Sequence, residues 1–254
     1  MTEPIDLRPY QFIDFGCSSG GSSDLARKKL GGDRGLGLDI DPVKVALARK
    51  AGHDVLEVDA TKLPAVKGRV QFSVMSHFLE HLPSFEAARK CINNAVSLSN
   101  RYVYIQQPWF DSDPYLFRNG LKLYWSDWSG HPNRMTTLEF HCILWQLLER
   151  SRIVRYCIYG RQAIETSGNR DVHPLESPVN SKDWTEGAHL SKKEIVFTEP
   201  VFREIVVILA VKDPAVIEKV ESRVKRSQKL LDSAALRSPK TTAPTADTLP
   251  PQIG

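Results

Sequence analysis

Short apolar segments alternate with helical patterns over the first hundred residues, and this alternation limits the fold more than any other feature of the chain. The apolar segments that we predict to be buried strands are 11–15, 35–39, 54–58, 70–76 and 101–106. The segments between them with apolar residues at helical spacing are 22–30, 43–51 and 85–98. Strands and helices that alternate at this spacing predict an α/β fold, with a parallel sheet covered by helices on both faces.

Two long segments interrupt this pattern in the second half of the chain. Residues 109–136 bring three tryptophans together with prolines and glycines, and residues 160–201 are polar and rich in turn residues. A helix over 137–150 and strands over 152–159 and 202–211 are predicted around them. Insertions in such a sheet commonly lie over the site at the strand ends. We therefore expect one domain over residues 1–211 whose two insertions shape its site.

The last part of the chain, residues 212–254, differs from the rest. The spacing of Val216, Ile217, Val220, Val224 and Leu231 predicts a helix over 213–231. The segment after it is rich in Ser, Pro and Thr, and we expect it to be disordered. The expected role of the helix is to pack on the domain or to remain a solvated tail.

The distribution of charge argues against a nucleic-acid partner. The chain carries a net charge of +4, but residues 212–254 hold eight Lys/Arg against five Asp/Glu, so the domain itself carries only +1. No segment approaches the roughly 18 apolar residues of a membrane span, and the first residues lack the layout of a secretory signal. Four scattered cysteines suggest neither a zinc knuckle nor a disulfide framework. We expect a cytoplasmic protein without a membrane span.

The most informative motif is a small-residue loop that follows the first strand, Phe12-Ile-Asp-Phe-Gly-Cys-Ser-Ser-Gly-Gly21. Dinucleotide enzymes need GxGxxG here, but Ser18 occupies the second glycine position. Hydrolases need GxSxG, which Gly16 to Gly20 match literally, yet a nucleophile elbow requires earlier strands. A third pattern, Asp14-x-Gly16-x-Ser18-x-Gly20, has an acidic residue followed by small residues at alternate positions. Such a loop lets backbone approach a ligand closely, and Asp14 can accept hydrogen bonds from a cationic group.

Later motifs follow this loop in a characteristic order. Gly35-Leu-Gly-Leu-Asp39-Ile40 ends the second strand, Glu57-Val-Asp59-Ala60 the third and Phe72-Ser-Val-Met-Ser76-His77 the fourth, before a Leu-Glu-His-Leu turn. The segment Ser129-Gly-His131-Pro-Asn-Arg-Met-Thr136 then opens a helix. With the loop, these motifs resemble class I S-adenosylmethionine-dependent methyltransferases, of the type 11 small-molecule family. The resemblance covers about residues 11–159 and the strand over 202–211.

The resemblance implies a Rossmann-like methyltransferase fold, with a doubly wound, mostly parallel sheet of seven strands whose last strand is antiparallel. It also implies S-adenosylmethionine as the cofactor, with Asp39 on the ribose hydroxyls and Asp59 on the adenine. The residues predicted to bind the cofactor are Asp14, Gly16, Cys17, Gly20, Asp39, Ile40, Asp59, Ala60, Ser76 and His77.

Methyl transfer mainly requires alignment and exclusion of water, and it requires a base where the acceptor is a hydroxyl or a protonated amine. His131 and His81 are the candidate bases, with Asp111 third. The aromatic residues expected to form an apolar wall around the acceptor are Trp109, Tyr124, Trp125 and Trp128. The acceptor is expected to be a small molecule or glycan-like. The alternatives are a catalytically idle cofactor-binding or interaction protein and, less favoured by the charge, an RNA methyltransferase.

The turn also spells His77-x-x-Glu80-His81, the HxxEH pattern that places two ligands and a base on one helical face of inverted zinc peptidases. Here His77 leaves a buried strand and Pro83 follows at once, so a single helix bearing all three side chains is not expected. Some ubiquinone-pathway O-methyltransferases use acidic and His residues around this turn for a divalent metal, so the resemblance leaves a metal site open as an alternative. The sequence identifies no third or fourth ligand. We therefore predict no metal site.

Overall fold

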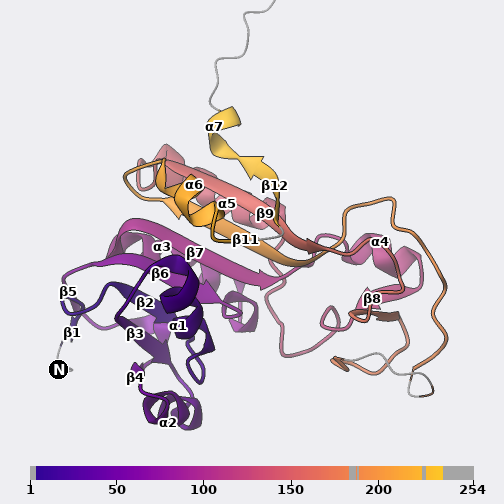
Figure 1. Cartoon of the computed structure of the whole chain (residues 1–254), viewed down its shortest axis with the longest axis horizontal. Coiled ribbons are helices and arrows are strands. Elements are labelled where there is room, and N and C mark those ends of the chain that lie inside the picture. Colours follow the sequence, from indigo (N-terminus) through magenta and orange to yellow (C-terminus); the bar gives the residue numbers. More distant parts are fainter. Residues whose placement is uncertain (1–3, 183–186, 188, 225–226, 237–254) are drawn as a thin grey trace, which may run out of the picture.

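A mixed sheet of eight strands forms the centre of the computed structural model, which describes residues 4–182, 187, 189–224 and 227–236 (Figure 1). In spatial order the strands are β12 (Ser227–Asp232), β9 (Arg155–Ala163), β11 (Phe202–Ala210), β7 (Ser99–Pro108), β6 (Val70–Ser76), β2 (Phe12–Phe15), β3 (Gly35–Asp39) and β4 (Asp54–Glu57). Neighbours from β4 to β7 are parallel, whereas β11 is antiparallel to both β7 and β9. The predicted fold class, mostly parallel with an antiparallel last strand of the core, is confirmed.

Helices cover both faces of the sheet because its central strands bury side chains on both sides. In β7, Val103 and Ile105 belong to one apolar cluster, whereas Tyr102 and Tyr104 belong to a second. Helices α3 and α5 pack in the first cluster, and α6 and η1 in the second. The helices are α1 (Gly21–Leu25) with its π-helical continuation η1 (Ala26–Leu30), α2 (Pro42–Lys50), α3 (Phe85–Leu98), α4 (Asp113–Arg118), α5 (Thr137–Glu149), α6 (Val216–Glu221) and α7 (Ser233–Leu236), with 3₁₀ turns η2 (Ala60–Lys62) and η3 (Leu79–His81). No helix within these described residues has the length and apolarity to span a membrane.

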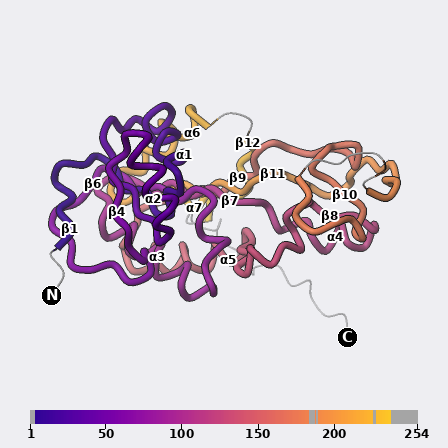
Figure 2. The backbone as a smooth tube through the Cα atoms, turned by 90° about the horizontal axis from the view of Figure 1, so that it is seen from below, coloured from indigo at the N-terminus to yellow at the C-terminus, as the bar shows by residue number. Residues whose placement is uncertain are grey.

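The two predicted insertions pair with each other and form one lobe. Strand β8 (Leu121–Leu123) of the first insertion pairs in antiparallel fashion with β10 (Val172–Pro174) of the second. The lobe lies at one end of the molecule, beyond the ends of β7, β9 and β11 (Figure 2). The lobe is therefore held by backbone pairing between segments about fifty residues apart. A third, small sheet elsewhere in the molecule pairs β1 (Ile5–Asp6) with β5 (Val66–Lys67).

The helix predicted over 213–231 is wrong for most of its length. Helix α6 ends at Glu221, and Ser227–Asp232 form strand β12, which pairs with the outer edge of β9. An open strand edge presents unpaired N–H and C=O groups, and pairing them outweighs the modest helical pattern of the sequence. The sheet therefore has eight strands where seven were predicted. The predicted disordered segment falls on residues 237–254, which lie outside the described residues.

An ion pair anchors β12 to β9. The guanidinium of Arg155 donates to both carboxylate oxygens of Asp232, at 3.0 and 2.6 Å, and also contacts Glu218 of α6. Both members of the main pair are largely buried, with exposed side-chain fractions of 15% and 19%. Bidentate geometry and partial burial make this pair stronger than an ordinary surface ion pair.

Replacing Arg155 with Ala should lower the free energy of unfolding by about 1.5–3 kcal/mol, because two charge-assisted hydrogen bonds are lost. Urea unfolding followed by circular dichroism measures this change. Arg69 is exposed, and Arg69→Ala, the matched control, should change stability by less than about 0.5 kcal/mol. Equal effects of the two substitutions would show that this ion pair does not anchor the strand.

Candidate active site

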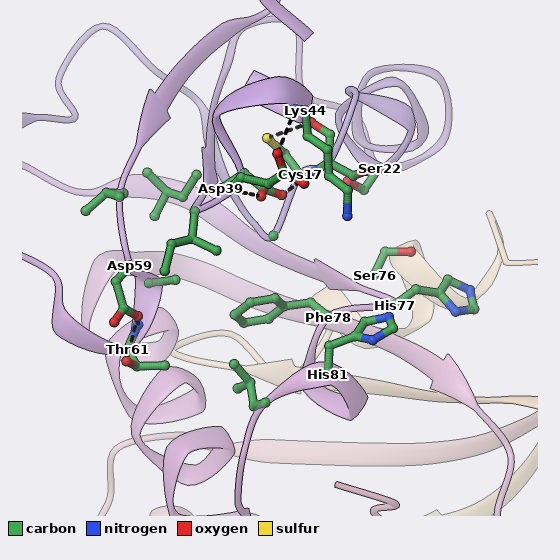
Figure 3. A pocket seen from close by; sticks show the side chains of 18 of the residues that line it. Cys17, Ser22, Asp39, Lys44, Asp59, Thr61, Ser76, His77, Phe78 and His81 are labelled. Atoms are coloured by element: carbon green, nitrogen blue, oxygen red, sulfur yellow. Dashed lines mark hydrogen bonds between the residues drawn. The ribbon is translucent and has the colours of Figure 1, made fainter. Parts of the chain in front are cut away.

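A large cavity of about 1100 Å³ opens at the carboxyl ends of β2, β3 and β6. This volume is slightly above the roughly 300–1,000 Å³ that small-molecule sites occupy. Parallel strands in a doubly wound sheet bring their carboxyl ends to the same edge, where ligands bind. Asp59 lies on one side of the cavity, and His77 and His81 lie on the other (Figure 3).

The loop after β2 reaches its shape through a glycine in close contact with an aromatic ring. Gly16 has a φ of +68°, and a Cβ built on it would lie 2.2 Å from Cδ2 of Phe78. Its amide donates to the carbonyl of Leu38 at 2.8 Å, which fixes the loop to the end of β3. The loop backbone therefore lies directly against the segment that follows β6.

Asp14 supports this loop from beneath the cavity. Its carboxylate is completely buried, and Oδ2 accepts hydrogen bonds from the hydroxyls of Ser22 and Ser23 at 2.6 and 2.7 Å. Its Oδ1 has no hydrogen-bond partner among the described residues. Burial raises the pKa of Asp14 to about 6, against the effect of the two serines. The site thus contains a buried acceptor atom available for a donor.

Two acidic residues at strand ends face the cavity. Asp39 accepts hydrogen bonds from the amides of Ser18 at 2.7 Å and of Asp41 at 3.0 Å. Asp59 accepts from the amide and hydroxyl of Thr61, and the hydroxyl bond is the first cause of a lowered pKa. Each carboxylate is held in place by backbone amides. Both retain acceptor capacity, because a carboxylate has about four lone-pair positions.

Eight of the ten residues predicted to bind the cofactor line this cavity, namely Gly16, Cys17, Asp39, Ile40, Asp59, Ala60, Ser76 and His77. Asp14 and Gly20 are not part of its wall. Gly20 has a φ of +105° and packs against His53, so it shapes the loop. Sequence analysis missed Phe78, whose contact with Gly16 has no signal in the local sequence.

His77, whose side chain is 45% exposed, lies between two buried carboxylates. Its Nε2 lies 3.2 Å from Glu204 of β11, and its Nδ1 lies 3.4 Å from Glu80. Burial alone would lower its pKa, but the nearby carboxylates of Glu204 and Glu80 outweigh this effect and raise the pKa to about 9. Glu204 also accepts from Arg161 at 2.8 Å. Because His77 is positively charged at neutral pH, it is a poor base. The sequence drew attention to Glu80 only as part of the HxxEH pattern, and Glu204 was not predicted.

A second cavity of about 250 Å³ borders the first, and His77 and His81 line both. Its further wall contains the predicted residues Tyr124, Trp125, Trp128 and His131 together with Glu80, Pro108, Asn180, Arg203 and Glu204. His131 is buried, and this burial lowers its pKa. Its ring centroid lies 5.0 Å from that of His81. The structure thus brings the two candidate bases together, from positions fifty residues apart.

Two other acceptor-side candidates lie elsewhere. The carboxylate of Asp111 accepts the amide of Thr137 at 3.0 Å, at the start of α5, and lines neither cavity. Trp109 packs on Phe202 and accepts a hydrogen bond from Trp125 at its carbonyl. These contacts give Asp111 a role in helix capping and Trp109 a role in packing.

The family model described as a methyltransferase domain matches residues 3–147, more than half of the chain. The chain belongs to this methyltransferase domain family. Among solved structures, the YcgJ protein of Bacillus subtilis is 12% identical, with 80% of this chain and 92% of that chain covered at a TM-score of 0.52. A SAM-dependent methyltransferase from Archaeoglobus fulgidus is 18% identical, with 80% and 90% covered at 0.51. These two likenesses show the fold alone. No curated protein matches the chain.

The resemblance to S-adenosylmethionine-dependent methyltransferases is confirmed, and the residues of this methyltransferase fit that cofactor. The carboxylate of Asp14 lies behind the wall and supports the loop from Gly16 through the hydroxyls of Ser22 and Ser23, and Asp39 can still accept from hydroxyls. Ile40 is 67% exposed although it lines the cavity, which leaves an apolar surface for a planar base. The wall thus offers one matching surface for each chemical part of the cofactor.

Substituting Gly16 with Ala tests how closely this methyltransferase packs its loop. Gly52 also has a positive φ, +86°, but an added Cβ there meets nothing within 4 Å. Gly52→Ala should cost only about 1 kcal/mol of stability from backbone strain and should leave binding unchanged. Gly16→Ala should in addition displace Phe78 and weaken S-adenosylhomocysteine binding about tenfold or more in calorimetry. Equal affinities in the two variants would contradict the close-packed loop.

Proposed function

We propose that the protein transfers the methyl group of S-adenosylmethionine to a hydroxyl or amine of a small-molecule or glycan-like acceptor. The observation that supports this most is that His77 and His81 line both cavities. The acceptor would bind in the smaller cavity, directly beside the cofactor. Methyl transfer between two bound molecules depends mainly on such adjacency.

The larger cavity has the groups needed to hold the cofactor. Asp39 would accept hydrogen bonds from the ribose hydroxyls, and Asp59 and the backbone at Ala60 would bind the adenine. The loop from Gly16 and the carboxylate of Asp14 would hold the methionine part. When bound, S-adenosylmethionine supplies an electrophilic methyl group on a sulfonium.

The histidine pair is suited to take the proton that the acceptor loses. His81 Nδ1 lies 2.8 Å from the carbonyl of Gly130, and His131 Nδ1 lies 3.3 Å from the carbonyl of Trp125. A carbonyl only accepts, so each Nδ1 carries the hydrogen and each Nε2 has a free lone pair. The proton of the acceptor O–H or N–H would pass to Nε2 of His131, with His81 orienting the acceptor.

The wall of the smaller cavity favours a hydroxylated acceptor of modest size. Tyr124, Trp125 and Trp128 supply flat apolar faces, and Asn180 and Arg203 supply polar groups. Such a mixture of aromatic and polar groups suits a sugar ring or a substituted aromatic compound. The net charge of +1 on residues 1–211 gives no basic surface for RNA. We place the reaction in the cytoplasm, where the four free cysteines would stay reduced.

Asp39→Ala should weaken S-adenosylhomocysteine binding by about 1–3 kcal/mol in calorimetry, because a charge-assisted acceptor for the ribose is removed. Asp39 is partly buried, whereas Asp33 is exposed and lies outside the cavity, and Asp33→Asn should bind like the wild type. Circular dichroism must show that both variants are folded. Unchanged affinity in Asp39→Ala, or preferential binding of NAD, would contradict the proposed cofactor contacts.

His131→Ala should reduce turnover by about 10²–10⁴-fold and leave cofactor affinity nearly unchanged, because it removes the proton acceptor and not a cofactor contact. The acceptor is identified first, by measuring which member of a panel of sugars, phenols, amines and RNA leads to release of S-adenosylhomocysteine. His141, on α5, provides the matched control.

A loss of less than threefold in His131→Ala would remove this residue from catalysis. Release with RNA alone would contradict the acceptor class. Tight cofactor binding without release on any acceptor would favour the idle cofactor-binding alternative.

A further inference from the structure

Turn η3 is fastened to the segment 130–133 by three hydrogen bonds. The backbone amide of Asn133 donates to the carbonyl of Glu80 at 3.2 Å, and its side chain donates to the carbonyl of Leu79 at 2.9 Å. The third bond joins His81 to Gly130 at 2.8 Å. These bonds hold the residues of η3 beside His131. The contact joins the segment after β6 to the first insertion, and these two segments are about fifty residues apart in the sequence.

Three ligand-type side chains converge at this contact. One potential ligand atom from each of Glu80, His81 and His131 lies within 4.8 Å of the other two. The ligands of a bound transition metal are separated by about 3–3.5 Å, given metal–ligand distances near 2.0–2.2 Å. A side-chain movement of about 1 Å would therefore close the set around an ion. Of the three residues, His81 is exposed, whereas Glu80 and His131 are buried.

Glu80 provides an independent indication that a ligand is bound here. Its side chain is completely buried, and neither carboxylate oxygen has a hydrogen-bond partner among the described residues. One of them, Oε1, faces His77 at 3.4 Å, and Oε2 lacks even that contact. A buried carboxylate with an unsatisfied oxygen is costly unless something positive or hydrogen-bonding meets it.

Both histidines are oriented as metal ligands are. The Nδ1 of each lies at a backbone carbonyl, of Gly130 for His81 and of Trp125 for His131, which leaves Nε2 as the nitrogen with a lone pair. Ligating histidines almost always donate the other ring hydrogen to a carbonyl or carboxylate, which fixes the tautomer and the ring direction.

We propose that Glu80, His81 and His131 bind one divalent transition-metal ion of the Zn²⁺ class. Two imidazoles and one carboxylate suit Zn²⁺ and similar ions, whereas Mg²⁺ and Ca²⁺ prefer oxygen ligands only. Three protein ligands leave open coordination positions. The three residues line the smaller cavity, so an acceptor oxygen bound there can fill one of these positions.

This site rests on the proposed function and changes one role in it. With the ion bound, Nε2 of His131 is a ligand and not the base, and the cation would both orient the acceptor hydroxyl and lower its pKa, so that its proton passes to water. The occupancy of the site can nevertheless be measured without any acceptor. The proposed metal site and the proposed methyl transfer can therefore be contradicted independently of each other. Cofactor binding without metal binding contradicts only the metal site, and metal binding without transfer to any acceptor contradicts only the proposed reaction.

The test titrates Zn²⁺ into the full chain after chelator treatment and removal of any affinity tag, in competition with a chromophoric chelator. We expect one ion per chain, unaffected by millimolar Mg²⁺. Glu80→Gln and His131→Ala should each weaken Zn²⁺ binding by about 10–100-fold or more, and Co²⁺ should give visible absorption bands only with the wild-type site. His141→Ala is the matched histidine control, and Cys142→Ser removes the exposed thiol. Both should bind Zn²⁺ like the wild type.

Retained S-adenosylhomocysteine affinity shows that each variant is folded. A stoichiometry well below one, or equal Zn²⁺ affinity in the wild type and both ligand variants, would overturn the proposal. Loss of binding in Cys142→Ser would do the same. An effect of Glu80→Gln confined to the titration of the His77 ring, seen by NMR, would show that Glu80 serves only its ion pair and would also overturn the site.

Discussion

The contact between Gly16 and the ring of Phe78 is the constraint on which both cavities depend. The ring occupies the space that a side chain at position 16 would fill, at 2.2 Å from the ideal Cβ position. This contact is possible because β2 and β6 are adjacent and parallel, so the segments after both strands leave the sheet at one edge. The loop that would hold the cofactor and the turn that carries Glu80 and His81 are thereby packed against each other, in addition to the hydrogen bonds that fix each of them.

Sequence reasoning succeeded where function follows the order of the chain. The glycine loop follows β2, Asp39 ends β3 and Asp59 follows β4, and strands joined by helices place these ends side by side. A local pattern and one topological rule therefore suffice to predict most of the cavity wall. The roles of these residues toward the cofactor follow from the family resemblance and remain predictions.

Sequence reasoning failed where a partner segment decides the structure. Residues 227–232 have a helical pattern, yet they form a strand because β9 offers an open edge and Arg155 an oppositely charged partner for Asp232. The pairing of β8 with β10 and the approach of His131 to η3 are likewise contacts between distant segments. No local signal in a single sequence predicts such contacts, so Glu204 was not predicted, and the HxxEH pattern that contains Glu80 did not reveal its contact with the first insertion.

A series of four charged side chains lies along the two cavities and connects the structure of the site to its function. Glu80, His77, Glu204 and Arg161 follow one another with alternating sign, at 3.4, 3.2 and 2.8 Å. Removing such ions from water costs free energy that apolar residues of similar volume would avoid, so stability alone does not account for them. This series of four charged side chains runs from the smaller cavity, along the wall of the larger one, to Arg161 on β9. These ion pairs therefore connect residues that line both cavities. The charge on His77 depends on two glutamates that come from different parts of the fold.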